Sequence, residues 1–280
     1  MTRAHASLAA GVLVAFAALL PASAQADPES DRLTVRRGFE KRFPGIPFDD
    51  YVLGGFMLNP DGRRHYEDIM AFPPFEVEVD RGKAMWETPL RDGSTYAQCL
   101  PDGGRGVAGT YPRYDEKERQ LITFEMMLNR CRAAAGDPQY AYDDMQTMGV
   151  LTAYARTLSD GSRMDIRVES PGALERYEAG KALFHRRMGQ MNFSCANCHI
   201  DNAGKIMRME IISPALGQAT HFPIFRGGDV LYTAHARYTR CMEQVRAQPF
   251  SMGGDEFKDL EYFHSYLSNG LPLKASVYRR

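Results

Sequence analysis

One short segment of the sequence has residue types and spacing that could do redox or metal chemistry. Cys195, Cys198 and His199 stand in the order Cys-x-x-Cys-His. This is the attachment motif of c-type haem, in which each thiol adds to a vinyl group and the histidine gives the iron an axial ligand. A thioredoxin-like thiol pair would need a βαβ context, whereas the flanks look helical. A zinc site would need a second ligand pair, which the sequence lacks. The motif therefore predicts covalently bound haem.

The second axial position of such an iron is the main functional question. Cys241 follows Arg237 by four positions, so both side chains lie on one face of a helix. An arginine beside a thiol, from Arg237 or from the neighbouring Arg240, favours the thiolate that binds metals and attacks sulfur. An arginine fork also suits an oxyanion. Thioether or imidazole ligands remain alternatives, and the candidates are Met207, Met209, Met242, Met252, His221 and His235.

The composition and the N-terminal segment describe an exported globular protein. The chain has 280 residues, of which 44% are hydrophobic and 25% are charged, and a net charge of −1. This composition is usual for soluble domains, and the charge gives no reason to expect binding to nucleic acid. Residues 1–26 combine Arg3, an apolar run at 8–20 and Ala-x-Ala sites, the pattern of a signal peptide. We therefore expect a periplasmic mature protein without a membrane span.

Three sequence landmarks occur twice in the same order. The pairs are residues 81–86 and 179–184, residues 129–132 and 239–242, and residues 151–161 and 260–270. Ordered landmarks of this kind indicate an internal duplication. We therefore predict a mainly α fold with two tandem small domains, at 76–165 and 166–280. An N-terminal arm at 27–75, rich in turn residues, should precede them with one or two short helices.

Apolar spacing predicts the helix that carries a cysteine in each copy. In the first copy this helix should cover residues 114–135 and end at Gly136. In the second copy it should cover residues 229–246 and end before Pro249. Each copy should then close with one more helix.

The two copies differ at their cysteines. Cys99 is followed by Leu-Pro-Asp-Gly, without the second cysteine and the histidine of the haem motif. The first copy should therefore carry no haem. In an oxidising compartment Cys99 and Cys131 are the natural disulfide pair, and two free thiols are the alternative. This pairing leaves Cys241 as the odd thiol among five cysteines.

Together these features resemble the SoxA family, a cytochrome subunit of the sulfur-oxidising Sox system. The likeness rests on the haem motif at 195–199, on Arg-x-x-x-Cys at Arg237 and Cys241, and on residues 111–114 and 129–132 of the first copy. It covers nearly the whole mature chain. Many members carry haem in both cytochrome c-like domains. Because the segment after Cys99 departs from that pattern, the chain resembles the single-haem branch, with one covalently bound haem c.

The resemblance implies an L-cysteine S-thiosulfotransferase. Such enzymes couple thiosulfate oxidatively to a cysteine of a SoxYZ-like carrier protein, in a heterodimer with a SoxX-like monohaem cytochrome c. By position, His199 would be the proximal iron ligand and Arg237 would bind substrate. Cys241 would be both the distal ligand and the catalytic cysteine, found as a persulfide. The alternative is a periplasmic monohaem electron-transfer cytochrome c without a catalytic role, in which Cys241 would be dispensable.

Overall fold

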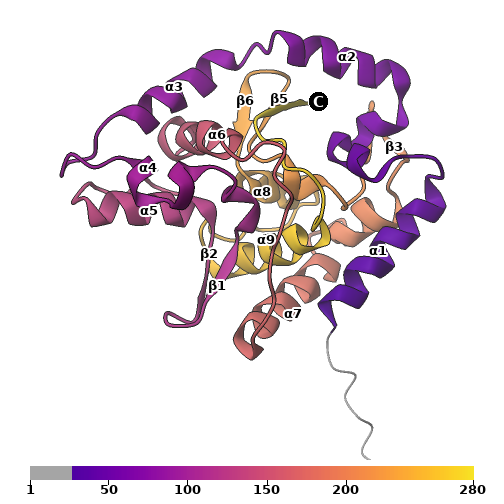
Figure 1. Ribbon diagram of the computed structural model, residues 1–280. Coiled ribbons are helices and arrows are strands. Elements are labelled where there is room, and N and C mark those ends of the chain that lie inside the picture. Colours follow the sequence, from indigo (N-terminus) through magenta and orange to yellow (C-terminus); the bar gives the residue numbers. More distant parts are fainter. Residues whose placement is uncertain (1–26) are drawn as a thin grey trace, which may run out of the picture.

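The computed structural model describes residues 27–280, and this part of the chain is mainly helical with three small sheets (Figure 1). The predicted fold class is thus confirmed in its main feature. The predicted signal peptide at 1–26 lies outside the described residues. Within residues 27–280, no helix combines the length and the apolar character needed to cross a membrane.

The N-terminal segment is more helical than its sequence indicates. It contains α1 (Pro28–Arg42), the 3-10 segment η1 (Phe48–Leu58) and α2 (Pro60–Ala71). Asp27 and Asn59 cap the two α-helices by accepting hydrogen bonds from backbone N–H groups of the first turn. A proline follows each cap at the first helical position, where its fixed φ suits a helix start. These caps therefore stabilise the starts of α1 and α2, where the apolar periodicity of the sequence is weak.

The chain then runs through two successive series of similar elements. The first consists of α3 (Glu76–Glu87), α4 (Tyr96–Cys99), η2 (Pro101–Gly104), η3 (Ala108–Thr110), β1 (Arg113–Asp115), β2 (Gln120–Ile122), α5 (Phe124–Ala134), η4 (Met145–Gly149) and α6 (Val150–Thr157). The second consists of α7 (Pro171–His185), η5 (Asn197–Asp201), β3 (Ile206–Met207), β4 (Glu210–Ile211), η6 (Gln218–Thr220), β5 (Ile224–Arg226), β6 (Val230–Tyr232), α8 (Ala234–Gln244), α9 (Asp255–Leu267) and β7 (Val277–Arg279). The domain boundaries given above stay predictions.

The two cysteine-bearing helices begin later than the sequence predicts. An antiparallel hairpin precedes each of them, β1–β2 before α5 and β5–β6 before α8. Thr123 and Thr233 stand at the junctions, where each side chain caps the helix that follows. A threonine at this position favours a helix start. Leu121, an apolar residue of the hairpin, fits the helical spacing although it lies before the start of α5. The predicted helix was therefore too long at its N-terminal end.

Each series closes through a helix pair that meets at a glycine. α3 packs on α6 and α7 packs on α9. A Cβ atom on Gly82 would lie 2.2 Å from the carbonyl oxygen of Val150, and one on Gly180 would lie 2.0 Å from that of Asp259. Only glycine permits so close an approach of two backbones. The repeated Gly-Lys-Ala sequence therefore marks the same helix crossing in both halves.

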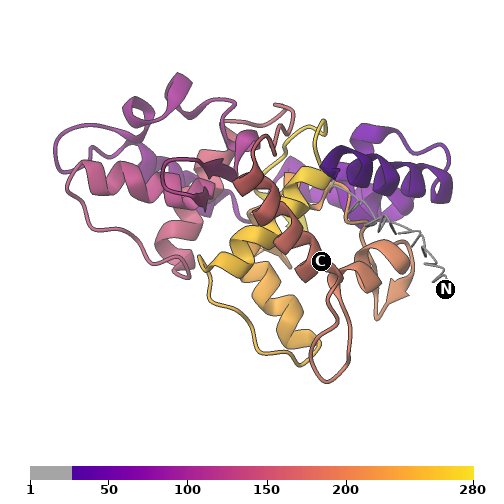
Figure 2. The same ribbon diagram turned by 90° about the horizontal axis from the view of Figure 1, so that it is seen from below.

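The two halves share one hydrophobic core. Figure 2 shows them side by side, with α1 against the orange-to-yellow second half. One cluster of buried residues spans both halves. Phe75, directly before α3, stacks on Phe225 with ring centroids 4.1 Å apart, and β2 contacts α9. The N-terminal segment is tied to the second half by an ion pair between Asp31 and Lys181, 2.6 Å long.

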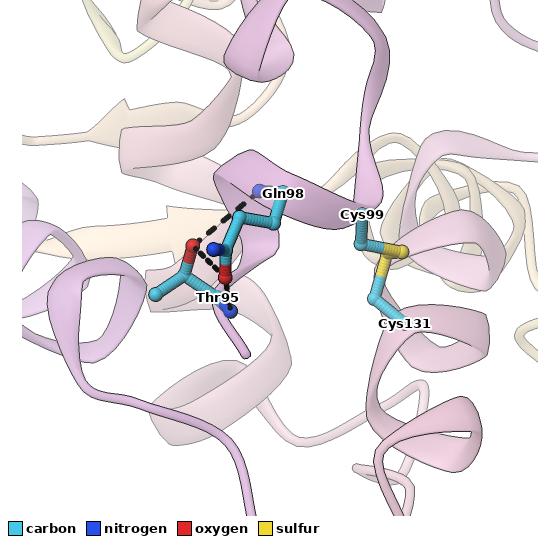
Figure 3. Close-up of a disulfide and its surroundings, with 4 residues drawn as sticks. All are labelled: Thr95, Gln98, Cys99 and Cys131. Atoms are coloured by element: carbon cyan, nitrogen blue, oxygen red, sulfur yellow. Dashed lines mark hydrogen bonds between the residues drawn. A yellow bond between two sulfur atoms is a disulfide. The ribbon is translucent and has the colours of Figure 1, made fainter. Parts of the chain in front are cut away.

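A disulfide joins Cys99 and Cys131, as the sequence predicts (Figure 3). Cys99 ends the short helix α4, and Cys131 lies on α5. A capping box starts α4, because Thr95 and Gln98 each accept a hydrogen bond from the other's backbone N–H. The disulfide therefore fixes a one-turn helix that could not be stable by itself.

Gly180→Ala should destabilise the protein. The added methyl group meets the backbone of α9, and such overpacking costs about 1–3 kcal/mol of unfolding free energy. Gly38 in α1 is the matched control, because a Cβ atom there meets nothing within 4 Å. Gly38→Ala should leave stability unchanged or raise it by up to about 1 kcal/mol. Denaturant unfolding measures both, and equal effects would contradict the close crossing.

Replacing both Cys99 and Cys131 by serine should lower the unfolding free energy. The cysteines are 32 positions apart, and loss of such a loop constraint corresponds to about 3–4 kcal/mol in the chain-entropy model. Denaturant unfolding with and without a thiol reductant is the measurement. Reductant should destabilise the parent protein and leave the double variant unaffected. An unchanged double variant would show that the disulfide is not a main support.

Candidate functional site

The Cys-x-x-Cys-His segment forms a tight capped turn after α7. Ser194 and Asn197 bond reciprocally: the Ser194 hydroxyl accepts from the Asn197 backbone N–H at 3.1 Å, and the Asn197 side chain accepts from that of Ser194 at 3.2 Å. Helix begins at Cys195 and continues as η5. Cys195 and Cys198 are free, half-buried thiols. Their separation by three positions places them on one side of the turn.

The His199 ring is held through one nitrogen. Its Nδ1 lies 2.9 Å from the carbonyl oxygen of Ser213. A carbonyl oxygen only accepts, so Nδ1 carries the proton and Nε2 keeps its lone pair. This is the tautomer that can bind a metal through Nε2. The backbone N–H of Ala215 donates to the His199 carbonyl at 2.8 Å, which fixes the Ser213 segment against the turn.

Cys241 lies on α8 and faces His199. The two side chains are close enough for His199 to lower the pKa of the Cys241 thiol. Burial would raise the pKa of the Cys241 thiol, but the charge of Arg237 and the nearby His199 outweigh it and lower this pKa to about 7. The thiol is therefore poised to act as a thiolate near neutral pH.

The thiols of Cys195 and Cys198 lie close to Cys241. Burial, and then the charge of Cys241, raise the pKa of Cys195 to about 12 and also raise that of Cys198. The tertiary structure therefore brings together all four side chains for which the sequence predicts a haem contact. Within residues 27–280, no three His, Cys, Asp or Glu side chains are arranged to hold a bare metal ion.

Two arginines direct positive charge at Cys241. Nη1 of Arg237 is buried and has no hydrogen-bond partner, which is unusual for a buried donor. The second is Arg226 on β5. Burial raises the pKa of Cys241, Arg237 and His199 lower it, and the charge of Arg226 lowers it further. Arg226 pairs with Glu210 at 2.9 Å. Arg240, which the sequence offers as a neighbour, is exposed and pairs with Glu243 at 3.0 Å instead.

The other candidate ligands are placed or engaged elsewhere. Met207 and Met209 are 51% and 89% exposed on the β3–β4 hairpin. Nε2 of His235 pairs with Glu261 at 3.0 Å. The remaining three are His221, which bonds Arg279, Met242, which belongs to the hydrophobic core, and Met252, which lies in a cleft beside Tyr140 and Tyr142.

The donor set fits a haem of the c type. It offers two thiols on one side of a turn, an imidazole with Nε2 available, and a low-pKa thiol facing that imidazole. The unpartnered Nη1 of Arg237 adds a cation that can meet an anionic group. Sequence reasoning missed Arg226, because a hairpin residue outside any motif gives no signal until the fold brings it to α8.

Comparison with known proteins gives consistent matches. The family model "SoxA/TsdA, cytochrome c domain" matches residues 81–164. The L-cysteine S-thiosulfotransferase subunit SoxA of Chlorobaculum tepidum is 38% identical over 96% of each chain. That of Allochromatium vinosum is 39% identical over 91% of each chain.

The chain belongs to the SoxA family. It is thus a subunit of an L-cysteine S-thiosulfotransferase, a cytochrome c of thiosulfate oxidation. The structure agrees, because it superposes on a crystal structure titled SoxXA from P. pantotrophus with a TM-score of 0.67 at 31% identity. That match covers 74% of this chain and 79% of the other. The function implied by the sequence is confirmed, and the alternative of a non-catalytic electron carrier is not supported.

Arg226→Gln should lower kcat/KM for thiosulfate about tenfold, because it removes a charge that attracts the anion and stabilises the thiolate. Arg240→Gln is the matched control and should change nothing, because Arg240 is exposed on α8 and it is Arg237 and Arg226 whose charges lower the pKa of Cys241. Steady-state turnover at fixed ionic strength measures both. A loss of activity in the Arg240 variant with none in the Arg226 variant would contradict the assignment.

Proposed function

We propose that this subunit carries one haem c, attached at Cys195 and Cys198 with its iron between His199 and Cys241, and that Cys241 is the catalytic cysteine. The observation that carries the proposal is the contact between His199 and Cys241, beside the buried and unpartnered Nη1 of Arg237. His199 and Cys241 would both hold the iron, and Cys241 would also be the nucleophile. An iron–thiolate bond is a known mode of haem ligation.

A single haem is supported by the first half, which we propose to be a cytochrome c-like domain without haem. There the disulfide occupies the place of the attachment motif. Trp86 stacks on Tyr96 with ring centroids 5.4 Å apart, and Phe124 and Leu128 are fully buried. Side chains therefore fill this core without a cofactor. The second half is then the haem-binding cytochrome c-like domain.

The proposed reaction begins with the Arg237 guanidinium, which binds the sulfonate oxygens of thiosulfate through the unpartnered Nη1. The sulfane sulfur then forms a bond to the sulfur at Cys241, and two electrons leave to a c-type cytochrome. A thiolate of the carrier protein attacks that sulfane sulfur and releases the Cys241 sulfur as the leaving group, by thiol–disulfide exchange. When bound, the haem would supply one-electron redox chemistry, and His199 and Cys241 would hold its iron.

Partners and location follow from the same proposal. The structure that this chain matches is a SoxXA complex, and we propose a heterodimer with a SoxX-like monohaem cytochrome c as electron acceptor. The second partner is a SoxYZ-like carrier whose cysteine receives the thiosulfate sulfur. A signal peptide at 1–26 would send the chain to the periplasm. There the Cys99–Cys131 disulfide is stable against reduction.

Intact mass of the purified mature protein, with and without thiol reductant, tests the proposal. The expected result is one haem, together with one reductant-labile sulfur on the Cys241 peptide. Cys241→Ala should abolish turnover and change the haem spectrum while the haem stays attached, because attachment uses Cys195 and Cys198. A Cys241→Ala protein with normal turnover would refute the catalytic role. A protein without haem would refute the cofactor assignment.

A further inference from the structure

Behind His199 lies a chain of buried hydrogen-bonded side chains that the mechanism does not use. The Gln218 amide lies 2.8 Å from Nδ1 of His199, and its other end lies 3.0 Å from Nε2 of His264 on α9. Nδ1 of His264 lies 2.9 Å from the hydroxyl oxygen of Tyr238 on α8. Gln218, His264 and Tyr238 are all buried. The chain therefore runs from His199 to the helix that carries Cys241.

The partners of the Gln218 amide decide the direction of its hydrogen bonds. The structure places the Gln218 nitrogen toward Nδ1 of His199 and toward the Ser213 hydroxyl, 2.5 Å away. Nδ1–H donates to the Ser213 carbonyl, so a nitrogen there would have no acceptor on His199. With the two amide ends exchanged, Gln218 presents an acceptor that shares Nδ1–H with the Ser213 carbonyl and accepts from the Ser213 hydroxyl. The only acceptor of a glutamine side chain is its oxygen. Because the two ends of an amide have the same shape, such hydrogen-bond partners fix which end is oxygen. The Gln218 oxygen therefore faces His199, and its NH₂ group donates to His264.

His264 continues the chain as a neutral ring. Burial, followed by the charge of His199, lowers the pKa of His264 to about 3. A neutral imidazole has one acceptor and one donor nitrogen. Nε2 accepts from Gln218, and Nδ1 then donates to the hydroxyl oxygen of Tyr238. Each of these buried polar groups thus has a partner, as buried groups require.

We propose that Gln218 and His264 are positioning residues that hold His199 with Nε2 available to iron and set how strongly this nitrogen donates electrons. The inference rests on the proposed ligation of haem iron by His199. A hydrogen bond accepted from Nδ1–H raises the basicity of the ligating nitrogen. Greater basicity stabilises the oxidised iron and lowers its reduction potential. Tyr238 stands three positions before Cys241, so the same chain also braces the helix of the second ligand.

Two variants of one residue give opposite expectations. In Gln218→Glu a carboxylate accepts more strongly from His199, so the midpoint potential of the haem should become more negative. In Gln218→Met the side chain has similar size but accepts no strong hydrogen bond, so the potential should become more positive. A purely structural role would predict shifts in the same direction. Potentiometric titration of the full mature protein, followed by electron paramagnetic resonance, reports this haem apart from that of a partner.

Two kinds of control isolate the hydrogen bonds. Gln146→Glu and Gln146→Met make the same changes at an exposed site of the first half and should not shift the potential. Tyr238→Phe breaks the far end of the chain and should give a positive shift smaller than that of Gln218→Met. Tyr262→Phe should give none, because this buried tyrosine donates to the Arg167 carbonyl outside the chain.

Unchanged potentials in both Gln218 variants, or shifts of the same sign, would overturn the inference. If the methionine variant attaches no haem, the glutamate variant decides: a potential equal to that of the parent protein refutes the proposal. Haem content separates this failure from failure of the proposed function. A parent protein without covalent haem would refute the proposed cofactor, whereas normal haem with unmoved potentials would refute only the role of Gln218 and His264.

Discussion

The crossing of α7 and α9 at Gly180 is the constraint on which the site depends. A Cβ atom there would lie 2.0 Å from a carbonyl oxygen of α9, so the two backbones are in direct contact. A short loop leads from the end of α7 to the Cys-x-x-Cys-His turn, and α9 carries His264 behind His199. Close packing at this glycine therefore fixes α7, which leads into the turn, against the helix that carries His264. Because protein interiors are close-packed, a small displacement of α7 against α9 would be passed on to the neighbouring side chains.

The second requirement is electrostatic. Burial, and then the charge of Cys241, raise the pKa of Cys195 to about 12, so this thiol stays protonated. Cys241 differs because Arg237 lies on its own helix and Arg226 approaches from the β5 strand. Two converging cations therefore assign different chemistry to cysteines of the same cluster. The pKa values of the motif thiols are raised, whereas that of Cys241 is lowered, as suits a nucleophile or a metal ligand.

The two halves show how one arrangement of helices supports different centres. Both close through a glycine crossing, and both place a cysteine on the helix that follows a hairpin. In the first half Cys131 bonds to Cys99, whereas the equivalent Cys241 faces His199. Aromatic packing around Trp86 fills the first core. The loss of a second cysteine and a histidine after position 99 is enough to explain the change.

The sequence by itself determined the helical class, the internal duplication, the disulfide and the family, because these depend on local motifs and on their order along the chain. It also gave Cys195, Cys198, His199, Cys241 and Arg237 as candidates, since each belongs to a short pattern, and the structure brings them together. It misplaced the starts of α5 and α8, where hairpin residues mimic helical spacing. Only the tertiary structure brought Arg226, Gln218 and His264 to the site. Their roles arise from long-range approach and from the direction of hydrogen bonds, which no spacing along the chain records.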